Sequence, residues 1–180
     1  MSSVVISGDT SGAITLSAPA VAGTNTITLP AITGTVSLNG PAFYAWSSAG
    51  SQSVSNNTFT KVTMATTGFN LNSNYSTANS RFTPTVAGYY LFNGVLYCAS
   101  STAMTGGRIA FYQNGSQVVT GLNNNQASTD IITSATAIYY MNGTTDYMEM
   151  WGIINGSAVG PVFAANSTYS FFQGSLLRAA

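Results

Sequence analysis

Short runs of alternating apolar and polar residues recur along the whole chain, separated by glycine, proline and asparagine. Such alternation is typical of strands, because successive side chains of a strand point to opposite faces of a sheet. Beyond residue 40 the runs that predict strands are Ala42–Trp46, Thr58–Met64, Ala87–Cys98, Arg108–Tyr112, Gln117–Thr120, Ile131–Tyr140, Tyr147–Ile153 and Tyr169–Leu177. Asn114-Gly115 between two of them is a strong hairpin signal. No stretch has a helical period with caps, so the pattern predicts an all-β sandwich, jelly roll or barrel.

The first 40 residues contain no aromatic side chain, and their only charged residue is Asp9. They read as short strands, and the run that starts at Ala13 is half repeated at Thr26, which predicts a small hairpin around Pro19 to Asn25. So few large side chains cannot stabilise a core alone. We therefore expect residues 1–40 to form an N-terminal β arm that packs on another subunit or protein, and residues 41–180 to form the head. The expected buried anchors of the arm are Ile14, Leu16, Ile27 and Leu29.

Charged residues make up only 4% of the chain and apolar residues 45%, with zero net charge. This balance excludes ordinary disorder, which needs few apolar residues and much charge. A monomer with so little charge has little repulsion to keep it soluble. We expect copies of the chain or a larger assembly to cover much of its surface; the alternative is a neutral, polar surface. The scattered Lys and Arg residues predict no nucleic-acid binding, and no apolar stretch is long enough to predict a membrane span.

The residue types needed for most catalytic and metal sites are missing. The chain has no histidine, which excludes Ser-His-Asp and Cys-His triads, and its single cysteine, Cys98, reads as a buried inert thiol. The carboxylates beyond the arm are Asp130, Asp146 and Glu149; we interpret them as solvated loop charges, with the last two on opposite faces of a strand. Weak calcium binding by Asp130 and Asp146 is an alternative. We expect no enzyme activity, metal or cofactor.

Aromatic side chains are the remaining resource of the predicted strands. The adjacent pairs Tyr89-Tyr90 and Phe171-Phe172 place one ring on each face of a sheet. One ring of each pair can fill the core, and the other must face solvent or a neighbour. With Phe92, these four residues are our candidates for the core and the subunit interface.

Two segments resemble known families. Ser80-Arg-Phe-Thr-Pro-Thr-Val-Ala-Gly-Tyr-Tyr-Leu-Phe92 resembles the F-x-x-P-x-x-G-x-Y-x-F signature of the tumour-necrosis-factor-like jelly roll, which complement-type heads share. Thr168 to Leu177 is similar to the last strand of that family, and the similarity covers residues 41–180 in the right order. The arm from Ser11 to Val36 looks like a segment of phage tail fibres and other virion surface proteins. The resemblances imply a jelly-roll head that forms homotrimers on a phage particle.

We therefore predict a non-enzymatic, homotrimeric capsid decoration or cement protein, made in the host cytoplasm and carried on the virion surface. Its partners would be its own copies and the major capsid protein or tail components. The first alternative is a tail-fibre or tail-tip head that binds host glycan through loops such as Gly121 to Asp130. The second is a glycan depolymerase, which needs two facing carboxylates.

Overall fold

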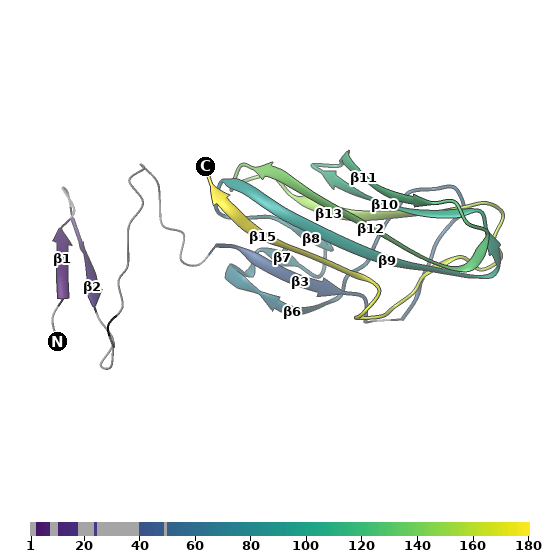
Figure 1. The fold of residues 1–180 in the computed structure, drawn as a ribbon, viewed down its shortest axis with the longest axis horizontal. Coiled ribbons are helices and arrows are strands. Elements are labelled where there is room, and N and C mark those ends of the chain that lie inside the picture. Colours follow the sequence, from purple (N-terminus) through teal and green to yellow (C-terminus); the bar gives the residue numbers. More distant parts are fainter. Residues whose placement is uncertain (1–2, 8–10, 18–23, 25–39, 49) are drawn as a thin grey trace. The chain divides into compact units, whose positions relative to one another are not determined.

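The computed structural model describes residues 3–7, 11–17, 24, 40–48 and 50–180. The chain divides into two compact units, Met1–Gly34 and Thr35–Ala180, and each is described by itself (Figure 1). The predicted boundary between an arm and a head at residues 40 and 41 stays a prediction. Within the described part of the chain, none of the helices has the length and apolar character that crossing a membrane requires.

The first unit contains an antiparallel hairpin of β1 (Ser3–Ser7) and β2 (Ala13–Ser17). The turn uses Gly12 at φ 79°, a conformation that glycine adopts without steric cost. The described partner of β2 is thus β1. Residues 26–29, the other half of the predicted hairpin around Pro19 to Asn25, lie outside the described residues, so that hairpin stays a prediction.

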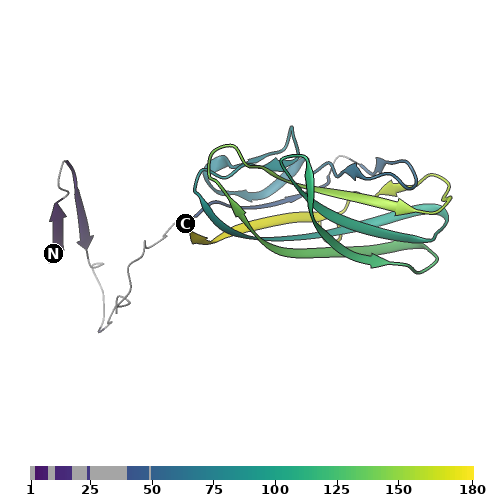
Figure 2. The same cartoon turned by 90° about the horizontal axis from the view of Figure 1, so that it is seen from above.

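The second unit is a sandwich of two antiparallel sheets (Figure 2). The seven-stranded sheet has the hydrogen-bonded order β4-β14-β9-β15-β3-β6. The remaining strand, β12, pairs with the edge of β9 opposite to β14 and β15. Its strands are β3 (Ala42–Trp46), β4 (Gln52–Ser53), β6 (Thr66–Asn70), β9 (Gly88–Met104), β12 (Ser128–Met141), β14 (Val162–Phe163) and β15 (Phe171–Ala179). Because its one described partner is β9, β12 forms an edge of this sheet.

The six-stranded sheet has the order β11-β10-β13-β8-β7, and β5 also pairs with β13. Its strands are β5 (Thr60–Lys61), β7 (Tyr75–Ser76), β8 (Arg81–Phe82), β10 (Gly106–Gln113), β11 (Ser116–Asn124) and β13 (Met148–Asn155). A single 3-10 turn, η1 (Leu71–Ser73), follows β6. The two-sheet arrangement confirms the predicted all-β jelly-roll sandwich.

Aromatic rings from both sheets fill the space between them. Phe43 of β3 stacks on Phe82 of β8, with ring centroids 4.6 Å apart, and meets the edge of Phe172 of β15 at 4.9 Å. Phe92 and Phe111 continue the cluster and are fully buried. Burying a side chain of this size contributes about 2 kcal/mol, so this cluster holds the two sheets together.

Most of the predicted strands lie where the alternation placed them. One predicted turn is confirmed, and the limits of two predicted segments differ from the structure. Asn114 and Gly115 have φ angles of 53° and 80°, the two positive values that a tight two-residue hairpin needs. The predicted strand Thr58–Met64 was wrong in extent, because only Thr60–Lys61 is strand. The predicted loop Gly121 to Asp130 was too long, because β11 runs to Asn124 and β12 begins at Ser128, which leaves residues 125–127 as the loop.

Candidate self-association face

The two adjacent aromatic pairs are split between the core and the outside of the seven-stranded sheet. Tyr90 is fully buried and its neighbour Tyr89 is 50% exposed. In the same way Phe172 is fully buried and Phe171 is partly exposed. Phe92 lies in the core. Of the five candidate residues, only Tyr89 and Phe171 are therefore available to a neighbouring subunit.

Strand register places further apolar side chains beside these two. Tyr140 lies opposite Tyr89, and Phe171 lies between Trp46 and Val95. We call the resulting surface the apolar sheet face. Its residues are Tyr44, Trp46, Phe69, Tyr89, Leu91, Val95, Tyr97, Ile132, Ile138, Tyr140 and Phe171, all partly or largely exposed.

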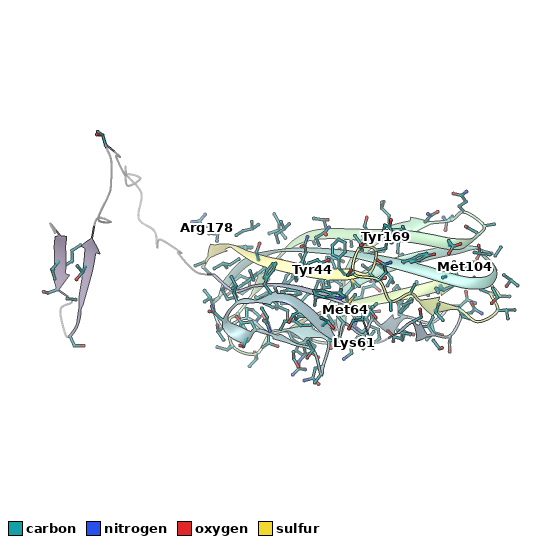
Figure 3. The ribbon with its side chains drawn as sticks, turned by 90° about the horizontal axis from the view of Figure 1, so that it is seen from below. Tyr44, Lys61, Met64, Met104, Tyr169 and Arg178 are labelled. Atoms are coloured by element: carbon teal, nitrogen blue, oxygen red, sulfur yellow. The ribbon has the colours of Figure 1, made fainter. Side chains whose placement is uncertain are left out.

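The aromatic rings on this face pack edge by edge rather than standing alone. Tyr44, labelled in Figure 3, lies between Trp46 and Phe171, and its ring centroid is 5.5 Å from each. Its hydroxyl donates a hydrogen bond of 2.7 Å to the carbonyl oxygen of Ser167. Tyr89 and Tyr140 meet edge to face at 5.6 Å. These contacts fix the rings in place before any partner arrives.

A short polar belt crosses the middle of the apolar sheet face. The Asn93 Nδ2 donates to Thr136 Oγ1 at 2.8 Å, and the Gln173 Nε2 donates to Asn93 Oδ1 at 3.4 Å. These three residues lie side by side on β12, β9 and β15. The belt leaves hydrogen-bonding capacity on Gln173, because its carbonyl oxygen has no partner among the hydrogen bonds of the described residues.

Charge is distributed very unequally between the two sheets. The strands of the seven-stranded sheet carry only Asp130 and Arg178, at opposite ends. Asp130 accepts a hydrogen bond from the Tyr97 hydroxyl, and this bond raises the pKa of Tyr97. The length of the apolar sheet face between these ends is uncharged in the described residues.

The strands of the six-stranded sheet carry Lys61, Arg81, Arg108 and Glu149. Glu149 is only 6% exposed, so the sequence-based interpretation of a solvated loop charge was wrong. Its Oε1 accepts from Lys61 Nζ at 3.1 Å, and its Oε2 accepts from Trp151 Nε1 at 3.0 Å. Trp151 stacks on Tyr112, with ring centroids 4.6 Å apart.

The other two cations of this sheet also lie over aromatic rings. The guanidinium carbon of Arg81 is 4.6 Å from the ring centroid of Tyr147, and that of Arg108 is 5.2 Å from the ring centroid of Phe59. A cation over a ring face is attracted by about 0.5–1 kcal/mol at an exposed site. The outer side of the six-stranded sheet is thus a mixed polar surface, unlike the apolar sheet face.

The three described carboxylates, Asp130, Asp146 and Glu149, are not brought together. Asp146 precedes β13 rather than lying on a strand, and its oxygens accept hydrogen bonds from the Asn142 N–H at 2.9 Å and Asn114 Nδ2 at 2.8 Å, which ties two turns together. Asp130 pairs with Ala99, at the far end of β9 from this turn. In the described part of the chain no three His, Cys, Asp or Glu residues group as metal ligands would.

Cys98 is fully buried, as its apolar setting predicted. Burial raises the pKa of its thiol to about 12. A thiol needs its thiolate form to act as a nucleophile. Cys98 is therefore a packing residue at neutral pH.

The candidate anchors of the arm are only partly covered by the structure. Ile14 and Leu16 lie in β2, and the register pairs them with Ile6 and Val4 of β1. By strand alternation these four positions share one face of the hairpin. The sequence-based prediction did not include the two positions on β1. Ile27 and Leu29 lie outside the described residues.

Comparisons with known proteins agree with this architecture. The model of the C1q domain family matches residues 42–177. The globular domain of zebrafish complement 1qA is similar at 19% identity and a TM-score of 0.57, over 78% of this chain and 99% of that one. The Eiger TNF of S. frugiperda gives 9% identity and a TM-score of 0.58, over 79% and 95%. Murine APRIL gives 10% and 0.55, over 77% and 99%.

At these identities the solved structures show the fold alone. None of the curated proteins matches the chain. The family model, however, spans most of the chain and covers every strand from β3 to β14. The chain belongs to the C1q domain family, with the jelly-roll sandwich that this family shares with tumour-necrosis-factor-like proteins.

Proposed function

We propose that the protein is a non-enzymatic, homotrimeric structural protein of a phage virion, a decoration or cement protein attached to the capsid. The observation that carries the proposal is the apolar sheet face, which is wide, rich in aromatic residues and almost uncharged. Proteins seldom leave such a surface in water, and large exposed apolar patches mark interaction sites. Relatives of the C1q and tumour-necrosis-factor type form homotrimers, which favours copies of the chain as the cover.

The energetics favour association. Each half-exposed apolar side chain of this face contributes about 1 kcal/mol when it is buried. The eleven side chains of the face would together contribute about 11 kcal/mol, which is comparable with an association cost of about 4–15 kcal/mol. In such a trimer the six-stranded sheet, with Lys61, Arg81, Arg108 and Glu149, would face the water. That orientation gives the assembly its polar exterior.

The hairpin of β1 and β2 is the proposed attachment device. A two-stranded hairpin by itself is only marginally stable in water, and an edge strand of such a hairpin can add to the sheet of a partner. The register places the apolar residues Val4, Ile6, Ile14 and Leu16 at positions of one face of the hairpin, and we propose that a partner covers this face. The three arms of a trimer would bind together, and effective concentration would multiply their modest single affinities.

Copurification with purified particles tests the attachment. We expect deletion of residues 2–38 to leave the oligomer intact and to abolish loading onto capsids. Ile14→Asp should reduce loading far more than the matched change Thr15→Asp, because the two positions lie on opposite faces of the hairpin. Normal loading of the deletion variant would place attachment in the head and contradict this part of the proposal.

A glycan-binding head of a tail fibre is the second candidate. The stacked pair Tyr112 and Trp151, beside Lys61 and Glu149, combines aromatic rings with hydrogen-bonding groups, as sugar sites do. Copy number separates the candidates, because a cement protein is present in hundreds per particle and a fibre in tens. A depolymerase has less support, since Asp130, Asp146 and Glu149 do not face one another.

A further inference from the structure

A hollow of about 180 Å³ opens on the apolar sheet face, over β3, β9 and β15. Its lining residues are Phe43, Phe69, Leu91, Asn93, Gln173, Gly174 and Ser175. The hollow lies where a small side chain, Ser175, stands beside the larger Leu91 in the same row of the sheet. A cavity of about 150 Å³ is large enough for a benzene ring, so the hollow can take a bulky side chain.

The residues that line the hollow determine which kind of side chain can bind in it. Leu91 and Phe69 offer apolar walls, and the amides of Asn93 and Gln173 form a polar rim that is already joined by a hydrogen bond. None of the described residues that line the hollow is charged. A charged partner group would lose its hydration there without an ion pair in return. The occupant must therefore be uncharged and largely apolar.

The register of the sheet points to one occupant. Ile138 of the edge strand β12 lies directly opposite Leu91, which in turn lies opposite Ser175 of β15. The hollow and Ile138 are thus in the same row, on different strands of one face. Ile138 is 59% exposed, which makes it one of the most exposed large apolar side chains of the head.

In a closed ring of identical copies, the residues that meet between neighbours lie at the same height along the axis of the ring. If the axis of the ring runs along the long strands, the rotation moves no atom along the strands, and a surface on one copy meets the next copy in the same row. We propose that Ile138 of one copy inserts into the hollow of its neighbour, beside Leu91 and Ser175, in a closed ring of three. This inference rests on the proposed homotrimer and names the residues that set its register.

Paired cysteines test the contact. In the variant Ile138→Cys with Ser175→Cys, the two positions of one chain are two strand spacings apart, about 10 Å. A disulfide needs Cα atoms within about 7 Å, so any bond between these positions joins two chains. Mild oxidation should convert the protein to covalent trimers on a non-reducing gel. The buried Cys98 and the two single variants give the background.

Ile132→Cys with Ser175→Cys is the matched control. Ile132 is also exposed on the same side of β12, at 48%, but six residues further along, about 20 Å away. It should give no covalent trimer. A trimeric protein in which the 138–175 pair fails to cross-link, or in which the 132–175 pair cross-links better, would overturn the proposed contact while leaving the homotrimer in place.

A second pair of variants avoids the need for new disulfides. Because Ile138 is exposed in the single chain, Ile138→Glu should fold, and we expect it to raise the trimer dissociation constant at least tenfold. Ile132→Glu should have a much smaller effect. Equal effects of the two changes would contradict the insertion. A wild-type protein that sediments as a monomer would overturn both this contact and the homotrimer.

Discussion

Lys61 and Glu149 form an ion pair between the short strand β5 and the central strand β13, with the Lys61 Nζ 3.1 Å from the Glu149 Oε1. The carboxylate is nearly buried, and its second oxygen accepts from Trp151. Lys61 Nζ also donates to the carbonyl oxygen of Asn79 at 3.0 Å. One carboxylate thus holds a cation and an indole in place on the outer side of the six-stranded sheet.

Replacing that carboxylate should destabilise the head. We expect Glu149→Ala to lower the free energy of unfolding by about 2 kcal/mol, because it removes the ion-pair partner of Lys61 and leaves the Trp151 N–H without its acceptor. Urea unfolding at a fixed chain concentration measures the change. Asp130→Asn, at an exposed carboxylate, is the control and should stay within about 0.5 kcal/mol. Equal losses in the two variants would refute the role given to Glu149.

Three buried groups make the fold sensitive to alkali: Cys98, Tyr90 and Tyr75, whose phenol pKa burial also raises. Burial raises the pKa of the Cys98 thiol from 9.0 to about 12, and that of the Tyr90 phenol from 10.0 to about 12. The unfolded chain loses these protons at lower pH than the folded chain does. The stability they contribute is therefore complete below pH 9.0 and is lost progressively as pH rises towards about 12.

We expect the melting temperature to fall from about pH 9 upwards. The variant Cys98→Ala should shift the start of the fall to about pH 10, where the Tyr90 contribution begins. Melting followed by circular dichroism between pH 7 and 11 measures this. The idea fails if both proteins show the same onset.

Replacement by alanine should affect different properties at the neighbours Phe171 and Phe172, self-association at the first and the stability of the fold at the second. Phe172→Ala opens a cavity among Phe43, Phe92 and Phe111, and we expect a loss of about 3–5 kcal/mol in the free energy of unfolding. Phe171→Ala should cost the single chain little and should weaken self-association instead. Thermal melts and sedimentation of both variants separate the two effects. An undisturbed trimer in Phe171→Ala would remove that ring from the interface.

The head should fold without the arm. The aromatic core lies entirely within residues 41–180, so a chain that starts at Pro41 holds the interactions that stabilise the sandwich. We expect a single cooperative β-type melt. Aggregation or the absence of a transition would mean that the arm contributes to the core and that the boundary is misplaced.

The sandwich could be predicted from the sequence because the patterns that indicate it, strand alternation and turn residues, involve residues that are close in the chain. Alternation at Ala42–Trp46 and the Asn114-Gly115 turn depend on neighbours in the chain, and both are found as expected. The same alternation separated Tyr89 from Tyr90 and Phe171 from Phe172. It could not say which ring of each pair faces the core, since that depends on how the two sheets pack.

Features that depend on contacts between distant parts of the chain could not be predicted from the sequence. Glu149 is buried because Lys61 and Trp151 cover it, and Lys61 reaches it only through the pairing of β5 with β13. Thr58–Met64 alternates like a strand, but most of it lacks a partner strand. The hollow beside Leu91 exists because β9 and β15 pair in one register. No local pattern carries that information.

Sedimentation equilibrium at micromolar concentration is the most direct test that the apolar sheet face joins copies of this C1q-type head. We expect a single species with three times the mass of the chain, and a weaker trimer for Ile138→Glu. A protein that stays at the mass of one chain, with the apolar sheet face left in water, would contradict the account.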